Sequence, residues 1–158
     1  MTASETSPSD HVAHEPRMSL AEQAPDVYRA MRALDASIQL DPVLRELIKI
    51  RASQLNGCAY CLDKHLHDAR AAGEAVQRLD TLGAWEESPF FTARERAALA
   101  LTDAITRVAG GPVPDAVYDE AARHFEDEEL AQVIFAAVAI NAWNRVAVST
   151  KMRVPARS

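Results

Sequence analysis

The sequence predicts an all-α, single-domain helical bundle. Hydrophobic residues make up 48% of the 158 residues but aromatic residues only 6%, a balance that suits helix-on-helix packing. The five glycines fall at the ends of periodic apolar segments rather than inside them. We find neither an alternating strand pattern of useful length nor an internal repeat. A chain of this length is therefore expected to form one domain of about six to seven helices.

The first residues differ in composition from the rest of the chain. Residues 1–17 are polar and rich in Ser, Thr and Pro, and we expect a disordered tail there. Its two histidines, His11 and His14, are expected to be solvated. The helical domain is expected to cover residues 18–152.

The first helices are predicted from their start signals. Ser19 and Glu22 have the spacing of a capping box, and Pro25 suits the first turn of a helix whose apolar residues recur to Ile38. Asp41 followed by proline predicts an N-cap and a new, largely buried helix that ends at Asn56-Gly57. Gly73 and a capping box at Thr92 mark later boundaries. The remaining helices are expected over about 58–72, 75–86, 92–108, 114–125 and 127–150.

The chemistry is concentrated in one segment. The two cysteines of the chain, Cys58 and Cys61, are followed by His65 and preceded by Glu46 in the buried helix. Positions i, i+3 and i+7 share one face of a helix, so both thiols and the imidazole are expected in one pocket. Free N–H groups in the first turn of the helix would stabilise a thiolate.

The roles of these residues follow from their spacing. His65 is the i+4 neighbour of Cys61, so we expect Cys61 to attack a peroxide and Cys58 to resolve the sulfenic acid as a disulfide. His65 and Glu46 would form the proton relay. Two other interpretations remain open: a redox switch or adaptor with little turnover, and a zinc-binding module using both cysteines, His65 and a carboxylate. Two inert buried cysteines are the third alternative.

We expect several other side chains to have structural rather than catalytic roles. His67 should point away from the pocket, and Asp68 with Arg70 should belong to a solvated helix face. His124 near a helix end suits a dipole contact. In the last helix, Trp143 is expected in core or interface packing. Asn141 and Asn144 are expected to line the pocket or a subunit contact with it.

Charge and composition exclude several classes of protein. A formal net charge of −6 argues against a nucleic-acid-binding surface. We find no apolar run near the length of a membrane span and no secretory signal, so we expect a cytoplasmic protein without a membrane partner. Two cysteines are also too few for a secreted disulfide scaffold.

Residues 46–74 closely resemble AhpD-like alkylhydroperoxidases of the carboxymuconolactone decarboxylase superfamily. The motif of that family is Glu, eleven residues, Cys-x-x-Cys, three residues and His, and Glu46, Cys58, Cys61 and His65 fill it without a gap. The likeness extends over about residues 19–150. It implies an all-helical fold and a thiol peroxidase that reduces organic hydroperoxides without a bound cofactor or metal, with the second cysteine peroxidatic.

The resemblance also implies partners. It implies a homo-oligomer, commonly a trimer or hexamer, and an external dithiol reductant that is lipoamide- or thioredoxin-like. The best-known branch has a second histidine where this chain has Tyr60, which points to a different proton relay or substrate. The decarboxylase branch lacks the cysteine pair, so decarboxylase activity is not expected.

Overall fold

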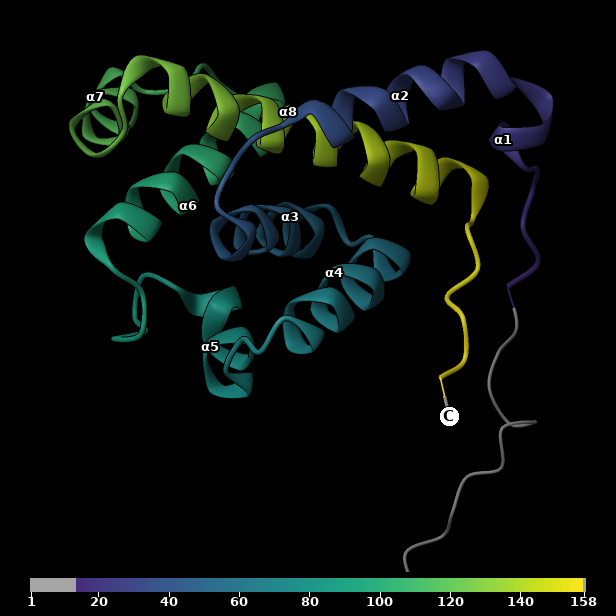
Figure 1. The fold of residues 1–158 in the computed structure, drawn as a ribbon, viewed down its shortest axis with the longest axis horizontal. Coiled ribbons are helices and arrows are strands. Elements are labelled where there is room, and N and C mark those ends of the chain that lie inside the picture. Colours follow the sequence, from purple (N-terminus) through teal and green to yellow (C-terminus); the bar gives the residue numbers. More distant parts are fainter. Residues whose placement is uncertain (1–13, 158) are drawn as a thin grey trace, which may run out of the picture.

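A computed structural model describes residues 14–157, and this part of the chain contains eight α-helices and no strand (Figure 1). The predicted all-α class is confirmed. Two short 3₁₀ turns, Leu82–Ala84 and Val108–Gly110, connect α-helices. The eight helices are α1 Leu20–Gln23, α2 Pro25–Ser37, α3 Pro42–Asn56, α4 Ala59–Ala71, α5 Val76–Thr81, α6 Ala93–Thr106, α7 Asp115–His124 and α8 Asp127–Thr150.

Helix α3 lies in the middle of the bundle and packs against α4, α6 and α8 (Figure 1). Leu47, Ile48 and Ile50 are almost completely buried, and they are spread around the helix rather than along one stripe. Even Lys49 and Arg51 are buried, because neighbouring helices cover every side of α3. Because α3 packs against α4, Glu46 on α3 can contact His65 on α4.

The predicted helix starts are confirmed, but one of the two predicted capping boxes does not form. The Asp41 carboxylate accepts the Leu44 N–H at 2.9 Å, and Thr92 forms both halves of its capping box. The Ser19 side chain accepts no capping hydrogen bond. The helix that starts after it ends within one turn, because Pro25 disfavours a helical conformation at Ala24 and starts a new helix. The separate α1 also brings the number of helices above the six to seven expected.

The junction between α3 and α4 depends on a glycine. Gly57 has a φ of 63°, in the left-handed region where a side chain would add strain. It ends α3 and turns the chain so that Cys58 becomes the N-cap of α4. The predicted helix over 75–86 is divided between α5 and the 3₁₀ turn Leu82–Ala84.

Helix α8 is more apolar than the sequence reading allowed. By length and composition, Asp127–Thr150 could cross a membrane, which corrects the expectation that no apolar run approaches that length. Half of its most apolar stretch is buried inside the bundle. A core helix of this kind passes the same test, so α8 is weak support for a membrane span.

The N-terminal end of the described chain contacts α8, and the C-terminal end contacts α4. Of the predicted tail, residues 1–13 lie outside the described residues, and His11 with them. Arg17 donates its backbone N–H to Thr150 O at 2.8 Å and its guanidinium to Ser149 O at 3.1 Å. After α8 the chain turns and runs past α4 (Figure 1), and Arg157 pairs with Asp63 on α4 at 2.7 Å.

Candidate active site

The two cysteines lie at the start of α4, buried between α3 and α8. Cys58 and Cys61 are 1% and 3% exposed, and both are free thiols. The Cys58 sulfur accepts the backbone N–H of Cys61 at 3.3 Å, the bond by which an N-cap side chain satisfies the first turn. The local sequence therefore fixes one thiol at the positive end of a helix.

The thiols differ in acidity. A hydrogen bond from the Cys61 thiol lowers the pKa of Cys58 to about 7; burial opposes this shift, and the Cys61 backbone N–H and Asn144 add to it. The same shared proton, together with burial, raises the pKa of Cys61 well above its usual range. When the pair loses a proton, the thiolate therefore lies on Cys58, which the sequence predicted to be the resolving thiol.

Glu46 and His65 are brought together, as their spacing predicts. Glu46 Oε2 on α3 lies 2.8 Å from His65 Nδ1 on α4. A carboxylate partner keeps the proton on Nδ1, which leaves Nε2 as a free acceptor. His65 is 7% exposed, so the pair is largely withdrawn from solvent. This arrangement can take a proton from a group in the adjoining pocket and return it.

Cys61 and His65 open onto the same pocket. Its volume is about 480 Å³, and its walls include Tyr28, Tyr60 and Trp143. The rings of Tyr28 and Trp143 meet edge to face with centroids 5.2 Å apart. Trp143 therefore lines the pocket as well as packing against α2. Cys58 does not line this pocket, which corrects the expectation that both thiols share one pocket with the imidazole; it lines a different hollow, beside the C-terminal segment.

An asparagine network behind the cysteines is the main feature that sequence reasoning left undefined. Asn144 is 1% exposed, and its Nδ2 donates to Ser53 Oγ at 2.9 Å. Asn56 Nδ2 donates to the oxygens of both Asn144 and Asn141 at 2.9 Å. This fixes the amide of Asn144 with its nitrogen toward the thiols, where it lowers the pKa of Cys58. The sequence signal was a pair of amides at i, i+3 in an apolar helix.

The side chains that could hold a metal do not form the set that the sequence suggested. Within residues 14–157, ligand atoms of Glu46, His65 and Asp68 lie within 4.8 Å of one another, and neither cysteine belongs to this group. The Asp68 side chain is 40% exposed and pairs with Lys64 at 2.6 Å on the outer face of α4.

The other assigned histidines lie away from the thiols. His67 is exposed and does not line the Cys61 pocket, as expected. Arg70 is exposed near the end of α4. His124 contacts Glu120 at 3.0 Å on α7. None of the three takes part in the cysteine pocket.

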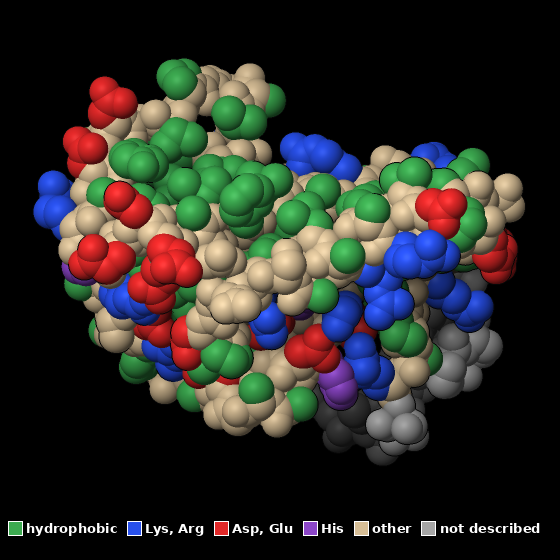
Figure 2. Space-filling view, turned by 45° about the horizontal axis from the view of Figure 1, so that its top comes forward, with side chains coloured by type: hydrophobic (Ala, Val, Ile, Leu, Met, Phe, Trp, Pro, Cys, Tyr) green, Lys and Arg blue, Asp and Glu red, His purple; other side chains and the backbone are tan. Residues whose placement is uncertain are grey.

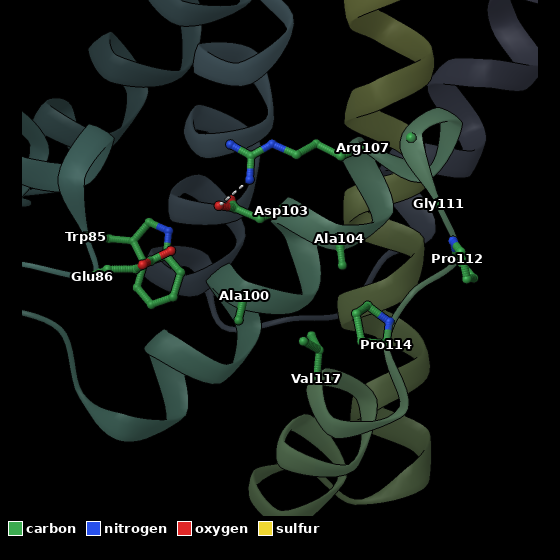
Figure 3. Close-up of a pocket in the computed structure, with 11 residues that line it drawn as sticks. Trp85, Glu86, Ala100, Asp103, Ala104, Arg107, Gly111, Pro112, Pro114 and Val117 are labelled. Atoms are coloured by element: carbon green, nitrogen blue, oxygen red, sulfur yellow. Dashed lines mark ion pairs between the residues drawn. The ribbon is translucent and has the colours of Figure 1, made fainter.

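A third hollow lies between α6, α7 and the turn after α5 (Figure 3). Asp103 lines it, and Arg107 approaches that carboxylate at 3.5 Å. Arg51 also holds Asp103, through two bonds of 2.6 and 2.7 Å. This hollow contains none of the predicted site residues, and its acidic group is already paired.

Comparison with known proteins identifies the family of this chain. The sequence profile described as the carboxymuconolactone decarboxylase family matches residues 25–104. The uncharacterized protein YdfG of Bacillus subtilis is 37% identical over 144 residues, which cover 89% of this chain and 98% of YdfG.

Two solved structures share the fold. A protein of unknown function from Agrobacterium tumefaciens, provisionally described as the antioxidant defence protein AhpD, is 37% identical; the match has a TM-score of 0.87 and covers 90% of this chain and all of that one. An uncharacterized peroxidase-related protein from Silicibacter sp. TM1040 is 24% identical, with a TM-score of 0.73 over 87% of this chain and 81% of that one, and shows the fold alone. The chain belongs to the carboxymuconolactone decarboxylase family, as an AhpD-like member.

Proposed function

We propose that this protein is a thiol peroxidase that reduces organic hydroperoxides through a disulfide cycle between Cys61 and Cys58. The observation that carries the proposal is the common pocket of Cys61 and the Glu46–His65 pair, with aromatic walls that suit an organic group. A thiol beside a base that is itself held by a carboxylate is the arrangement of an activated nucleophile.

The proposed cycle begins at Cys61. Its sulfur attacks one oxygen of the O–O bond, which breaks to give a Cys61 sulfenic acid and an alkoxide. The alkoxide leaves as an alcohol with a proton from His65. The Cys58 thiolate then attacks the sulfenic sulfur and forms the disulfide, and the hydroxide that leaves takes a proton from solvent to become water. Reduction by an external dithiol, lipoamide- or thioredoxin-like, restores both thiols.

A thiolate on Cys58 is compatible with this order. Cys61 must lose the proton that it shares with Cys58, and His65 Nε2 takes it before giving it to the alkoxide. Access favours Cys61, because it lines the pocket with His65 and Cys58 does not. Acidity favours Cys58. The experiment must therefore separate the two sulfurs.

Single-cysteine variants separate them. Cys61→Ser and Cys58→Ser are each treated with one equivalent of tert-butyl hydroperoxide, and sulfenic acid is trapped with dimedone and located by mass spectrometry. We expect trapping on Cys61 in Cys58→Ser, and little in Cys61→Ser. Trapping only on Cys58 would reverse the assignment, and no peroxide consumption by the wild type would remove the peroxidase function.

We also propose a homo-oligomer, a trimer or hexamer, in the cytoplasm. Large apolar side chains are exposed on α2, α7 and α8, among them Leu34, Tyr118, Phe135 and Val138. Figure 2 shows hydrophobic side chains gathered on the side of the molecule along which these helices run. An apolar surface of this kind is typical of a subunit contact.

A redox switch is the second candidate, and the acidity of Cys58 favours it. A thiolate at neutral pH promotes thiol–disulfide exchange whether or not peroxide is turned over. The two functions differ in stoichiometry. With dihydrolipoamide present, a peroxidase consumes many equivalents of peroxide per chain, whereas a switch consumes about one.

A further inference from the structure

The two cysteines line different, adjoining hollows. Cys61 lines the pocket with His65, and Cys58 lines a hollow of about 670 Å³ formed with the C-terminal segment. Tyr60, Ala147 and Met152 line both spaces and so form the wall between them. The disulfide of the proposed cycle would lie across this wall, with one sulfur reachable from each side.

The hollow beside Cys58 is cationic, although the chain as a whole is acidic. Lys151 and Arg153 line it, and no carboxylate does so among the described residues. Both side chains are exposed, and the formal net charge of the chain is −6. The local charge therefore favours an anionic molecule over a neutral one.

The C-terminal segment, which forms the outer wall of this hollow, is held to α4 by an ion pair. Residues 152–156 follow α8, and the next residue, Arg157, holds Asp63 through contacts of 2.7, 3.1 and 3.2 Å. Asp63 lies on α4, between the cysteines and His65. The segment is thus held beside the start of the cysteine helix.

We propose that the reducing dithiol enters through this hollow and attacks Cys58, and that it is a small dithiol bearing an anionic group. This inference rests on the proposed function. The peroxide would use the Cys61 pocket, so oxidant and reductant approach the disulfide from opposite sides of the wall formed by Tyr60, Ala147 and Met152.

The exchange balances as two thiol–disulfide steps. One donor thiolate attacks the Cys58 sulfur, the Cys58–Cys61 bond breaks, and Cys61 leaves and takes a proton from solvent through His65. The second donor thiol releases its proton to solvent, and its sulfur attacks the first donor sulfur in the mixed disulfide. Cys58 leaves as a thiolate that the Cys61 N–H stabilises, and the donor is released as a cyclic disulfide.

Two matched alanine variants test the side of entry. Ala59 is exposed and lines only the Cys58 hollow, whereas Ala36 is exposed and lines only the Cys61 pocket. In Ala59→Trp we expect reduction of the disulfide to slow at least about tenfold, while oxidation by tert-butyl hydroperoxide stays within about twofold. In Ala36→Trp we expect the reverse. Val148→Trp, on another wall of the hollow, is the second variant if Ala59→Trp does not fold.

Charge is tested with two donors of the same length. Dihydrolipoate is anionic and dihydrolipoamide is neutral. At low ionic strength, Arg153→Glu should slow reduction by dihydrolipoate about threefold or more and leave dihydrolipoamide unchanged. Arg70→Glu, which reverses an exposed charge on α4 outside both spaces, should change neither rate.

The disulfide for these measurements is formed with diamide, so reduction is measured even if peroxide oxidises the protein poorly. Equal reduction of wild type and Ala59→Trp, or slowing of both half-reactions by Ala36→Trp, would overturn the proposed route. Equal effects of Arg153→Glu on both donors would overturn the anionic donor. Failure of peroxide oxidation alone would instead count against the proposed function.

Discussion

Glu46 Oε2 lies 2.8 Å from His65 Nδ1, across the packed interface of α3 and α4. Because the carboxylate fixes the proton on Nδ1, Glu46→Gln should weaken His65 as a base while leaving it in place. We expect the rate of disulfide formation with peroxide to fall at least about tenfold, with a changed pH profile. Stopped-flow tryptophan fluorescence measures this half-reaction.

A matched control exists on the surface. Glu120 contacts His124 at 3.0 Å, also through a carboxylate and an imidazole, but on α7 and far from the thiols. Glu120→Gln should leave both the rate and the pH profile unchanged. If Glu46→Gln behaved in the same way, His65 would not act through Glu46.

The acidity of Cys58 gives a second prediction. The largest cause of its lowered pKa, about 7, is the hydrogen bond from the Cys61 thiol. Cys61→Ala removes this donor, so the pKa of Cys58 should rise and the thiolate fraction at pH 7 should fall below one half. Thiolate absorbance in the ultraviolet, followed against pH, measures the shift. An unchanged midpoint would mean that the helix N-terminus alone sets the acidity.

Asn144 gives a third prediction with its own control. In Asn144→Ala the amide that faces the thiols is lost, so the pKa of Cys58 should rise. Asn141 belongs to the same network on the same helix but donates to Thr106 Oγ1 and Ala137 O instead. Both alanine variants should lose about 1–3 kcal/mol of unfolding free energy, because each leaves buried polar partners unsatisfied. Only Asn144→Ala should shift the thiolate titration.

What the sequence could predict follows from how local each feature is. The Asp41 cap and the Thr92 capping box depend on side chains within three residues, and both form as predicted. The motif from Glu46 to His65 could be placed because it lies on two successive helices. The contact of Asn144 with the cysteines could not, because it depends on the register of α8 against α3.

The burial of charged side chains inside the bundle also could not be predicted from the sequence. Lys49 and Arg51 look like surface residues of a helix, yet both are buried and paired, with Asp35 and Asp103. The difference arises because α3 is covered on all sides, which depends on how α6 and α8 fold back over it. The pattern of apolar residues along a helix does not predict how many other helices pack against it.

The exposed apolar side chains lead to a prediction about assembly. Phe135 on α8 is 50% exposed. If this face forms a subunit contact, Phe135→Lys should convert the oligomer to smaller species, because a buried unpaired ammonium opposes association. Light scattering coupled to size exclusion measures the mass. Val76→Lys changes an equally exposed valine on α5 and should leave the mass unchanged.

The buried pair of Arg51 and Asp103 gives the last prediction, which concerns stability. Their side chains are 10% and 9% exposed, and the guanidinium also donates to Gly83 O at 2.9 Å. Asp103→Asn leaves a buried charge without its partner, so the free energy of unfolding in urea should fall by about 3–5 kcal/mol. Asp26→Asn breaks the exposed pair with Arg29 and should cost about 0.5 kcal/mol or less. Since Arg51 lies on α3 between Glu46 and the cysteines, Asp103→Asn should also slow peroxide oxidation if this pair holds α3 in register. A variant as stable as the wild type would show that Arg107 and Gly83 hold the guanidinium and the carboxylate without the pair.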